Sequence, residues 1–282
     1  MIRKILCAVL TLAATQLRAQ DYGGPAVADF ANVTRGRYQV FAQAGRQMAL
    51  EVNMFMNDML GRYEKFFNNW SGKAWSRVVV FDNPDDFRRY AGSVVSMTHA
   101  GLAGYCHFMT DEAGNQFYEL VTYQDANLWR VLAHEGFHQF VGYELGQQIP
   151  MWLNEGMAQF FETSFGTGSR FNVGQVSQQK LMLAQYLIIN KKAPPLGQLI
   201  QWDRTTFYAN ANVSYPMSWA LVTYLLNSNN DRFQQSQFRR YMQDLKMGKD
   251  DLRSFQNRFG RDNNQWQSDF EDYILHLKAQ TD

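Results

Sequence analysis

The spacing of apolar residues changes along the chain, and it predicts sheet and helix in the first part. From about Val40 to Asn68, apolar residues recur every three or four positions, which predicts one long helix packed on a sheet. The β-branched run at 77–81 predicts a strand buried on both faces, and Asn, Pro and early acids at 83–91 predict a helix start. Residues 21–37 are rich in Gly and small residues, so they predict an irregular lead-in with room for one short strand.

The middle of the chain predicts a hairpin followed by two helices. Two β-prone runs in residues 105–123 flank the turn-forming residues 111–115, which is typical of a hairpin. Residues 127–143 have helical spacing, and Pro150 opens a second helix that reaches about Thr163. The Gly-, Ser- and Thr-rich residues 164–175 predict a loop or a short hairpin.

Beyond residue 175 the pattern contains no strand signal. Residues 177–189 are helical and stop before the stiff break at Pro194–Pro195. The chain therefore predicts the α+β class, with an α/β part over 20–175 and an all-helical part over 176–282. The remaining predicted helices cover 196–209, 213–227, 231–245, 249–259 and 262–279.

The N-terminus has the pattern of a secretory signal peptide over residues 1–19. Arg3 and Lys4 precede an apolar run at 5–14, and Leu17-Arg18-Ala19 form an acceptable cleavage site. No later stretch is long and uncharged enough to span a bilayer. We therefore expect an exported protein, periplasmic or extracellular, with no membrane anchor after cleavage.

Charge and cysteine content narrow the possible partners. Loss of three basic residues with the signal peptide changes the formal net charge from +1 to −2. A chain with so small a net charge is not expected to bind nucleic acid or an anionic membrane by electrostatic attraction. Cys7 leaves with the signal, so Cys106 has no partner within the chain. A disulfide framework is excluded, and the fold must rest on its apolar core.

The stretch "AHEGFHQF" carries the strongest chemical signal. His134 and His138 are four positions apart, so on a helix both rings project from one face and suit two nitrogens of one tetrahedral zinc ion. Glu135 lies about a quarter-turn away, placed to reach a water rather than the metal. H-E-x-x-H on a helix is the signature of zinc peptidases for this reason.

A catalytic zinc takes a third protein ligand, and Glu155 is the best candidate. It lies on the predicted amphipathic helix "PMWLNEGMAQFFE", where an uncompensated carboxylate is costly unless it is paired or binds metal. Glu144 and Glu162 are the competitors. Glu144 lies too close to the end of the first helix, and Glu162 lies two turns past Glu155.

These two helices resemble the gluzincin clan of zinc metallopeptidases, in particular the exported, peptidase MA-like proteins filed as a domain of unknown function. The downstream segment 195–226, in which a Tyr precedes a Ser-x-Ala-Leu-Val-type helix, is also similar, and the resemblance covers about 75–230. The second helix matches the family pattern at Trp152, Leu153, Glu155, Gly156 and Ala158.

The resemblance implies a zincin-like fold with the active site between the two halves of the chain. It implies one zinc ion per chain on His134, His138 and Glu155, with Glu135 as the general base that takes a proton from the attacking water. The hydroxyl of Tyr215 is then the candidate donor to the tetrahedral oxyanion, because it stands where the family places its Tyr.

The family also suggests how a substrate binds and where this chain departs from the pattern. Zincins hold peptide along an exposed edge strand, which places residues 104–108 near the cleft. Gluzincins often carry a carboxylate one turn after the ligand Glu, where it holds a zinc-bound His. Here Gln159 occupies that position, and its amide oxygen accepts the same bond without adding charge, so we expect lower ligand basicity and lower metal affinity.

Other cysteine and histidine residues are interpreted as structural. Cys106 is close enough in sequence to suggest a latency ligand, but a small buried thiol is the better interpretation. His99, His107 and His276 have no ligand spacing among themselves.

Three functions are open on these grounds. The favoured one is an exported zinc metallopeptidase acting on peptide or protein substrates, with an endopeptidase slightly favoured over an aminopeptidase. The alternative is a catalytically inactive, secreted binding or scaffold protein with a zincin fold, suggested by Gln159 and by the lack of a pro-segment. Hydrolysis of a non-peptide amide or ester would use the same water and base.

Overall fold

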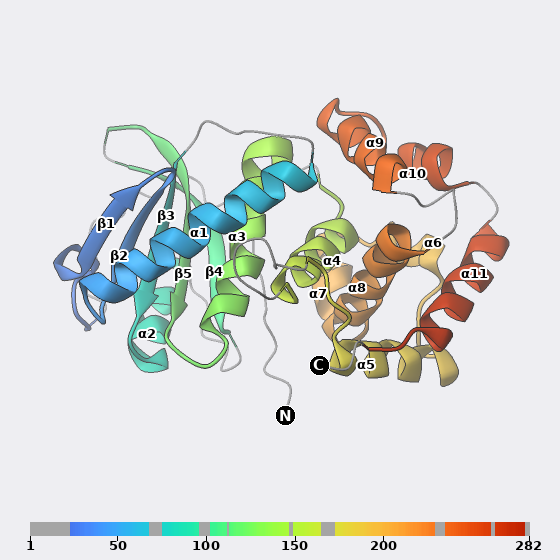
Figure 1. Ribbon diagram of the computed structural model, residues 1–282, viewed down its shortest axis with the longest axis horizontal. Helices are drawn as coiled ribbons and strands as arrows, with labels where there is room; N and C mark the ends of the chain where they lie inside the picture. Colours follow the sequence, from blue (N-terminus) through green and yellow to red (C-terminus); the bar gives the residue numbers. More distant parts are fainter. Residues whose placement is uncertain are drawn as a thin grey trace. The chain divides into compact units, whose positions relative to one another are not determined.

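The computed structural model divides into two compact units, residues 1–144 and 145–282 (Figure 1). The division comes earlier than the boundary predicted at residue 175, because the helix that contains Glu155 packs on the helices that follow it. The expected signal peptide lies outside the described residues. The structure describes residues 23–67, 75–95, 102–111, 113–146, 149–164, 173–228, 235–260 and 263–279.

The first unit is built on a five-stranded mixed sheet in the order β1-β2-β3-β5-β4 (Figure 1). The two central pairings, β2 with β3 and β3 with β5, are parallel, and the two outer pairings are antiparallel. The strands are β1 (Ala31–Arg35), β2 (Tyr38–Ala42), β3 (Ser76–Phe81), β4 (Gly104–Thr110) and β5 (Gln116–Tyr123).

Helices cover both faces of this sheet. On one face, α1 (Arg46–Phe66) and α3 (Leu128–Leu145) pack on side chains such as Val78 and Leu120. On the other, α2 (Pro84–Val95) packs on side chains such as Val79 and Phe81. β3 is therefore buried on both faces, as its β-branched run predicts.

The N-terminal segment contains more strand than the sequence predicts. A short 3-10 helix, η1 (Val27–Asp29), precedes β1 and β2, and the long helix begins at Arg46 rather than near Val40. The expected start was wrong because residues 38–42 alternate between buried and half-buried side chains, which is the period of a strand. Gly45, with φ of +103°, then separates β2 from α1.

The other predicted elements of this unit are confirmed. Residues 104–123 form the β4–β5 hairpin, and the helix expected at 127–143 is α3. α2 begins where predicted, because the side chain of Asn83 accepts hydrogen bonds from the backbone N–H groups of Asp85 and Asp86.

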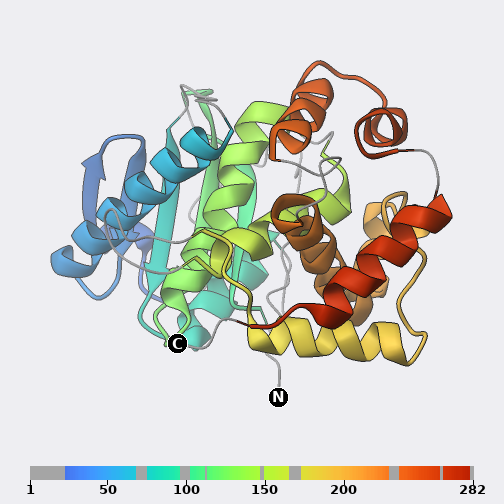
Figure 2. The same cartoon turned by 45° about the vertical axis from the view of Figure 1, so that its right-hand side comes forward.

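The second unit is all-helical in its described ranges (Figure 2). Its centre is α4 (Met151–Glu162), in which every residue is buried and which packs on α8 (Ala211–Asn227). α5 and α11 lie beside each other, and the side-chain amide of Gln185 donates to the carbonyl of Ile274. The further helices are α5 (Gln178–Ile189), α6 (Leu196–Leu199), α7 (Arg204–Ala209), α9 (Gln235–Lys246), α10 (Asp251–Phe259) and α11 (Asn263–His276).

One helix predicted in this unit is divided into two helices in the structure. Residues 196–209 form α6 and α7, because the side chain of Asp203 caps the second helix by accepting a bond from the Thr206 N–H at 2.8 Å. α8 also begins two residues earlier than predicted. Most of the segment expected as a loop or short hairpin, 165–172, lies outside the described residues.

The sequence-derived fold class is confirmed: the chain is α+β, with a small sheet in its N-terminal half and helices in its C-terminal half. Among the described helices, none has the length and apolar character needed to cross a membrane.

Candidate metal centre

The helix α3 is fixed to its unit by hydrogen bonds that run to its neighbours. The hydroxyl of Tyr63 on α1 donates to the carbonyl of Ala133 at 2.6 Å, one residue before the first motif histidine. The amide of Gln139 donates to the carbonyls of Arg77 (3.0 Å) and Tyr118 (3.3 Å). The motif residues therefore lie on a helix whose orientation about its own axis is fixed by bonds to α1 and to the sheet.

Close packing also limits what the motif can contain. A Cβ on Gly136, between Glu135 and the second histidine, would lie 2.9 Å from the Met56 methyl of α1. A larger residue at this position would therefore require the flexible end of the Met56 side chain to move.

His134 and His138 lie on one face of α3, as their spacing predicts. Their rings are 5.0 Å apart between centroids and inclined by 72°. His134 and Glu135 have no exposed surface, and His138 is 1% exposed. Three ionisable side chains are thus buried within two turns of one helix, which is uncommon unless they carry a function.

Glu155 is equally buried, on α4. It has no exposed surface, and its Oε1 accepts a hydrogen bond from the hydroxyl of Tyr208 at 3.1 Å. The next residue, Gly156, lies against α8, where a Cβ would meet the carbonyl oxygen of Ser218 at 2.6 Å. The Trp-Leu-x-Glu-Gly pattern therefore places its carboxylate on a helix that packs very closely on its neighbour.

The three predicted ligands form a cluster able to hold a metal ion. One ligand atom from each of His134, His138 and Glu155 lies within 4.8 Å of the other two, and all three side chains are buried. Two imidazole nitrogens and one carboxylate oxygen are a donor set of catalytic zinc sites, which keep a fourth position open. The residues present fit a zinc ion.

The competing carboxylates have other surroundings. Glu162 forms an ion pair with Lys180 of α5, with Oε1 and Nζ 3.0 Å apart. Glu144 lines a small recess of the first unit together with Arg37 and Tyr38. Neither belongs to the cluster of three.

Gln159 does not use its amide oxygen as expected. Its Oε1 accepts a hydrogen bond from Lys180 Nζ at 2.7 Å, and its Nε2 donates to the carbonyl of Tyr215 at 2.8 Å. The amide oxygen therefore serves Lys180, and Gln159 links α4 to α5 and α8. The expectation that it replaces a carboxylate beside a ligand histidine overlooked this lysine, which lies 21 residues further along the chain.

Tyr215 is half-buried, at the start of α8. Its ring lies 5.5 Å from that of Phe207 and 6.4 Å from that of Tyr208, measured between centroids. Its role as oxyanion donor stays a prediction. Tyr208 was not among the predicted site residues, because nothing in the spacing of "TTFYAN" distinguishes it from the other tyrosines.

The strand expected to hold substrate is an edge strand, but it is not exposed along residues 104–107, which are buried. β4 is the outermost strand and pairs with β5 on one side. Its first residue, Gly104, packs on α3, since a Cβ there would lie 2.6 Å from the Val131 side chain. Cys106 on this strand is fully buried, and burial, followed by the charges of Glu135 and Glu119, raises the pKa of its thiol. It is a small buried thiol.

His107 and His276 have partners of their own. His107 Nε2 lies 3.0 Å from Glu119 Oε1 on the neighbouring strand, and both side chains are fully buried. His276 Nδ1 lies 3.2 Å from Asp272 Oδ1 on the exposed side of α11. His99 lies outside the described residues.

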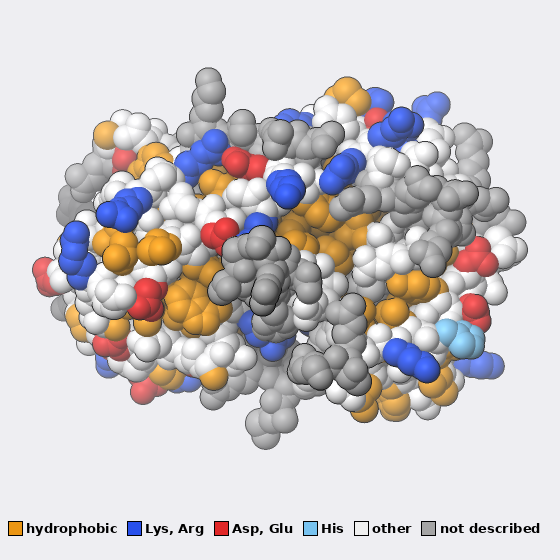
Figure 3. Space-filling model, in the orientation of Figure 1, with side chains coloured by type: hydrophobic (Ala, Val, Ile, Leu, Met, Phe, Trp, Pro, Cys, Tyr) orange, Lys and Arg blue, Asp and Glu red, His pale blue; other side chains and the backbone are white. Residues whose placement is uncertain are grey.

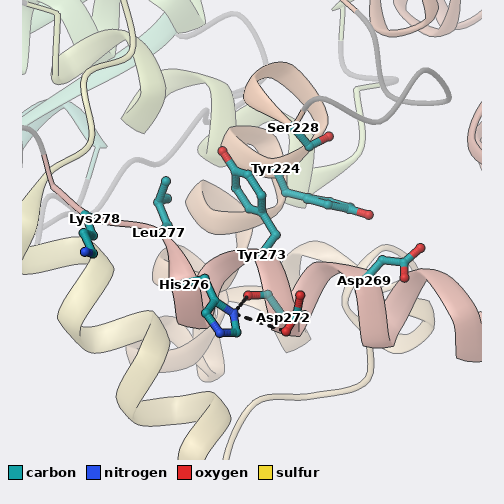
Figure 4. Close-up of a pocket in the computed structure, with 8 residues that line it drawn as sticks. All are labelled: Tyr224, Ser228, Asp269, Asp272, Tyr273, His276, Leu277 and Lys278. Carbon is teal, nitrogen blue, oxygen red and sulfur yellow. Dashed lines mark hydrogen bonds and ion pairs between the residues drawn. The ribbon is translucent and has the colours of Figure 1, made fainter.

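A separate surface pocket of about 640 Å³ lies in the second unit, between the end of α8 and one face of α11 (Figure 4). The described lining contains none of the predicted site residues. It is formed by Tyr224, Ser228, Asp269, Asp272, Tyr273, His276, Leu277 and Lys278.

Comparison with known proteins adds one match. Residues 129–244, from the start of α3 to near the end of α9, match the model of a family described as a protein of unknown function (DUF1570). No curated protein matches the chain. The matched region contains both motif helices and Tyr215, and the description of the family assigns no activity.

Proposed function

We propose that this chain is an exported zinc metallopeptidase that hydrolyses peptide bonds, with an endopeptidase favoured. The observation that carries the proposal is the buried cluster of His134, His138 and Glu155. Burial of two imidazoles and a carboxylate together is costly, and coordination of a metal ion offsets that cost. The gluzincin-like pattern of α3 and α4 supports the same assignment.

The proposed roles combine the buried cluster with the roles that the gluzincin resemblance implies. A zinc ion held by His134, His138 and Glu155 supplies Lewis acidity that makes water nucleophilic near neutral pH. Glu135 accepts the proton of the attacking water and delivers it to the leaving amine. Tyr215 donates a hydrogen bond from its hydroxyl to the oxyanion of the tetrahedral intermediate. The backbone of an extended peptide pairs with the partly exposed end of β4, residues 108–110.

The charge of the chain supports a peptide substrate rather than a nucleic-acid substrate. The formal net charge is +1 for the whole chain, and basic and acidic side chains are interspersed on the face drawn in Figure 3. A nucleic-acid enzyme of this size would be expected to carry a basic stripe.

The test starts from the mature protein, recovered outside the cytoplasm with its N-terminus at residue 20 or 21. Elemental analysis should find about one zinc per chain, and Glu155→Ala should lose it because two histidines alone hold zinc weakly. Glu135→Gln should keep the zinc and lower cleavage of a peptide library by about 10²- to 10⁴-fold. A cytoplasmic, uncleaved protein would contradict export, and equal cleavage by Glu135→Gln would contradict the mechanism.

The second candidate is a secreted binding or scaffold protein with this fold and no turnover. The bond between Gln159 and Lys180 favours it, because a neutral side chain with its oxygen already in use adds no negative charge near the ligands. Wild-type protein that contains zinc but cleaves no peptide, amide or ester would establish this candidate. Cleavage that disappears in Glu135→Gln would exclude it.

A further inference from the structure

The hydroxyl of Tyr208 donates a hydrogen bond to the carboxylate of Glu155. The two oxygens are 3.1 Å apart, and Glu155 has no exposed surface. We propose that Tyr208 is a positioning residue that sets the orientation of Glu155 as a metal ligand. The proposal rests on the metal site of the proposed function, and it assigns a role to a residue outside the H-E-x-x-H and Trp-Leu-x-Glu patterns.

Tyr208 is held firmly enough to serve this purpose. It lies on α7, which begins at the side-chain cap of Asp203 on the N–H of Thr206. The preceding residue, Phe207, is fully buried, and its carbonyl accepts a hydrogen bond from the hydroxyl of Ser214 at 2.8 Å. These two bonds hold the backbone of the short helix next to Tyr208 in place.

Neighbouring aromatic rings restrain the side chain further. The ring of Tyr208 lies 5.9 Å from that of Phe207 in an edge-to-face arrangement and 6.4 Å from that of Tyr215. Aromatic pairs at such separations favour defined relative orientations. The hydroxyl of Tyr208 is therefore directed by packing before any metal binds.

A hydroxyl suits this position better than a charged donor. A hydrogen bond to Oε1 restrains the rotation of the carboxyl group that would bind the metal. A neutral donor does this without a full positive charge that would compete with the metal for the carboxylate. The main chain of Glu155 is restrained as well, because Gln159 Nε2 donates to its carbonyl at 3.3 Å. The side chain of Glu155 thus has a hydrogen-bond partner in Tyr208, and its backbone carbonyl has one in Gln159.

The experiment measures zinc affinity directly, by competition with a chromophoric chelator, in the mature wild type and two variants. Tyr208→Phe removes one oxygen and should weaken zinc binding by about 10- to 100-fold, the usual effect of losing a partner of a ligating side chain. Tyr215→Phe removes the same atom from the neighbouring tyrosine. It should lower peptide cleavage while leaving zinc affinity near the wild-type value.

Thermal unfolding of the zinc-free proteins separates positioning from folding. Zinc-free Tyr208→Phe should melt within a few degrees of zinc-free wild type. Equal zinc affinity in wild type and Tyr208→Phe would overturn the positioning role and leave the proposed function standing. Loss of cooperative unfolding in zinc-free Tyr208→Phe would also overturn it, because the hydroxyl would then support the fold. A wild type that binds no zinc would overturn the proposed function itself, and the role of Tyr208 with it.

Discussion

At the scale of single residues, Glu119 shows how a buried carboxylate is accommodated without a metal. Its Oε1 lies 3.0 Å from His107 Nε2 and accepts from the Tyr90 hydroxyl at 3.2 Å, and its Oε2 accepts from Arg77 at 3.3 Å. Burial alone would raise the pKa of this carboxyl, but the bond and charge of His107, the charge of Arg77 and the bond from Tyr90 together lower it.

Because the pKa of Glu119 is lower in the folded chain than its ordinary value of 4.5, the ionised group stabilises the fold above that pH. This contribution is lost as the pH falls through the folded pKa. Glu119→Gln should therefore lower the free energy of unfolding at pH 7 by about 3 kcal/mol, as breaking a buried ion pair does. The difference from wild type should shrink below about pH 4.5.

Urea unfolding followed from pH 7 to pH 3 measures this difference. Glu51→Gln is the control, because Glu51 is an exposed carboxylate on α1 that accepts from Gln47. It should change the unfolding free energy by less than about 0.5 kcal/mol. A constant difference between wild type and Glu119→Gln over the whole pH range would show that the ionised network is not what Glu119 contributes.

At the scale of elements, the contact between α4 and α8 depends on a single missing side chain. Gly156 faces the carbonyl of Ser218 and the side chain of Val222, at 2.6 and 2.8 Å from where its Cβ would stand. Since a backbone carbonyl of a buried helix cannot move by itself, a larger residue must push the two helices apart. Glu155 is the adjacent residue on α4, so its position would shift with the helix.

Gly156→Ala should therefore destabilise the second unit by about 1–3 kcal/mol, the usual cost of overpacking, and should weaken zinc binding. Urea unfolding and chelator competition measure the two effects. Gly61→Ala is the matched control, because Gly61 is exposed on α1 with open space around its Cβ position. That change should be neutral or stabilise by about 0.5–1 kcal/mol, since alanine is the better helix former. Wild-type stability in Gly156→Ala would refute the packing argument.

At the scale of the whole molecule, a metal that binds only the folded chain adds to its stability. The proposed ligands come from two helices, α3 and α4, and an unfolded chain does not bring them together. The stabilisation grows with the logarithm of metal concentration and reaches about 2.7 kcal/mol at 100 times the dissociation constant.

Removal of metal with a strong chelator should therefore lower the midpoint of thermal unfolding by roughly 5–10 °C, given about 2–4 °C per kcal/mol for a chain of this size. The measurement is a melting curve with and without chelator. His134→Ala should show no such shift, because one ligand is already lost. A chelator effect of equal size in His134→Ala would place the stabilising metal elsewhere.

The sequence by itself determined the parts of this protein that depend on local spacing. The i, i+4 histidines, the hairpin at 104–123 and the cap of α2 at Asn83 follow from neighbours within a few residues, and the structure confirms the elements that carry them. The α+β class followed for the same reason, since strand spacing disappears in the second half. The signal peptide and the metallopeptidase activity stay predictions.

Only the tertiary structure decided contacts between residues far apart in the chain. Tyr208 reaches Glu155 across 53 positions, Lys180 takes the oxygen of Gln159, and the cross-strand register joins His107 to Glu119. Such partners depend on how the helices and strands pack together. The spacing of apolar residues predicts that a side chain is buried but does not predict which distant residue it contacts. Residues 40–42 were assigned to the long helix because the alternation of a five-residue strand is too short to stand out beside it.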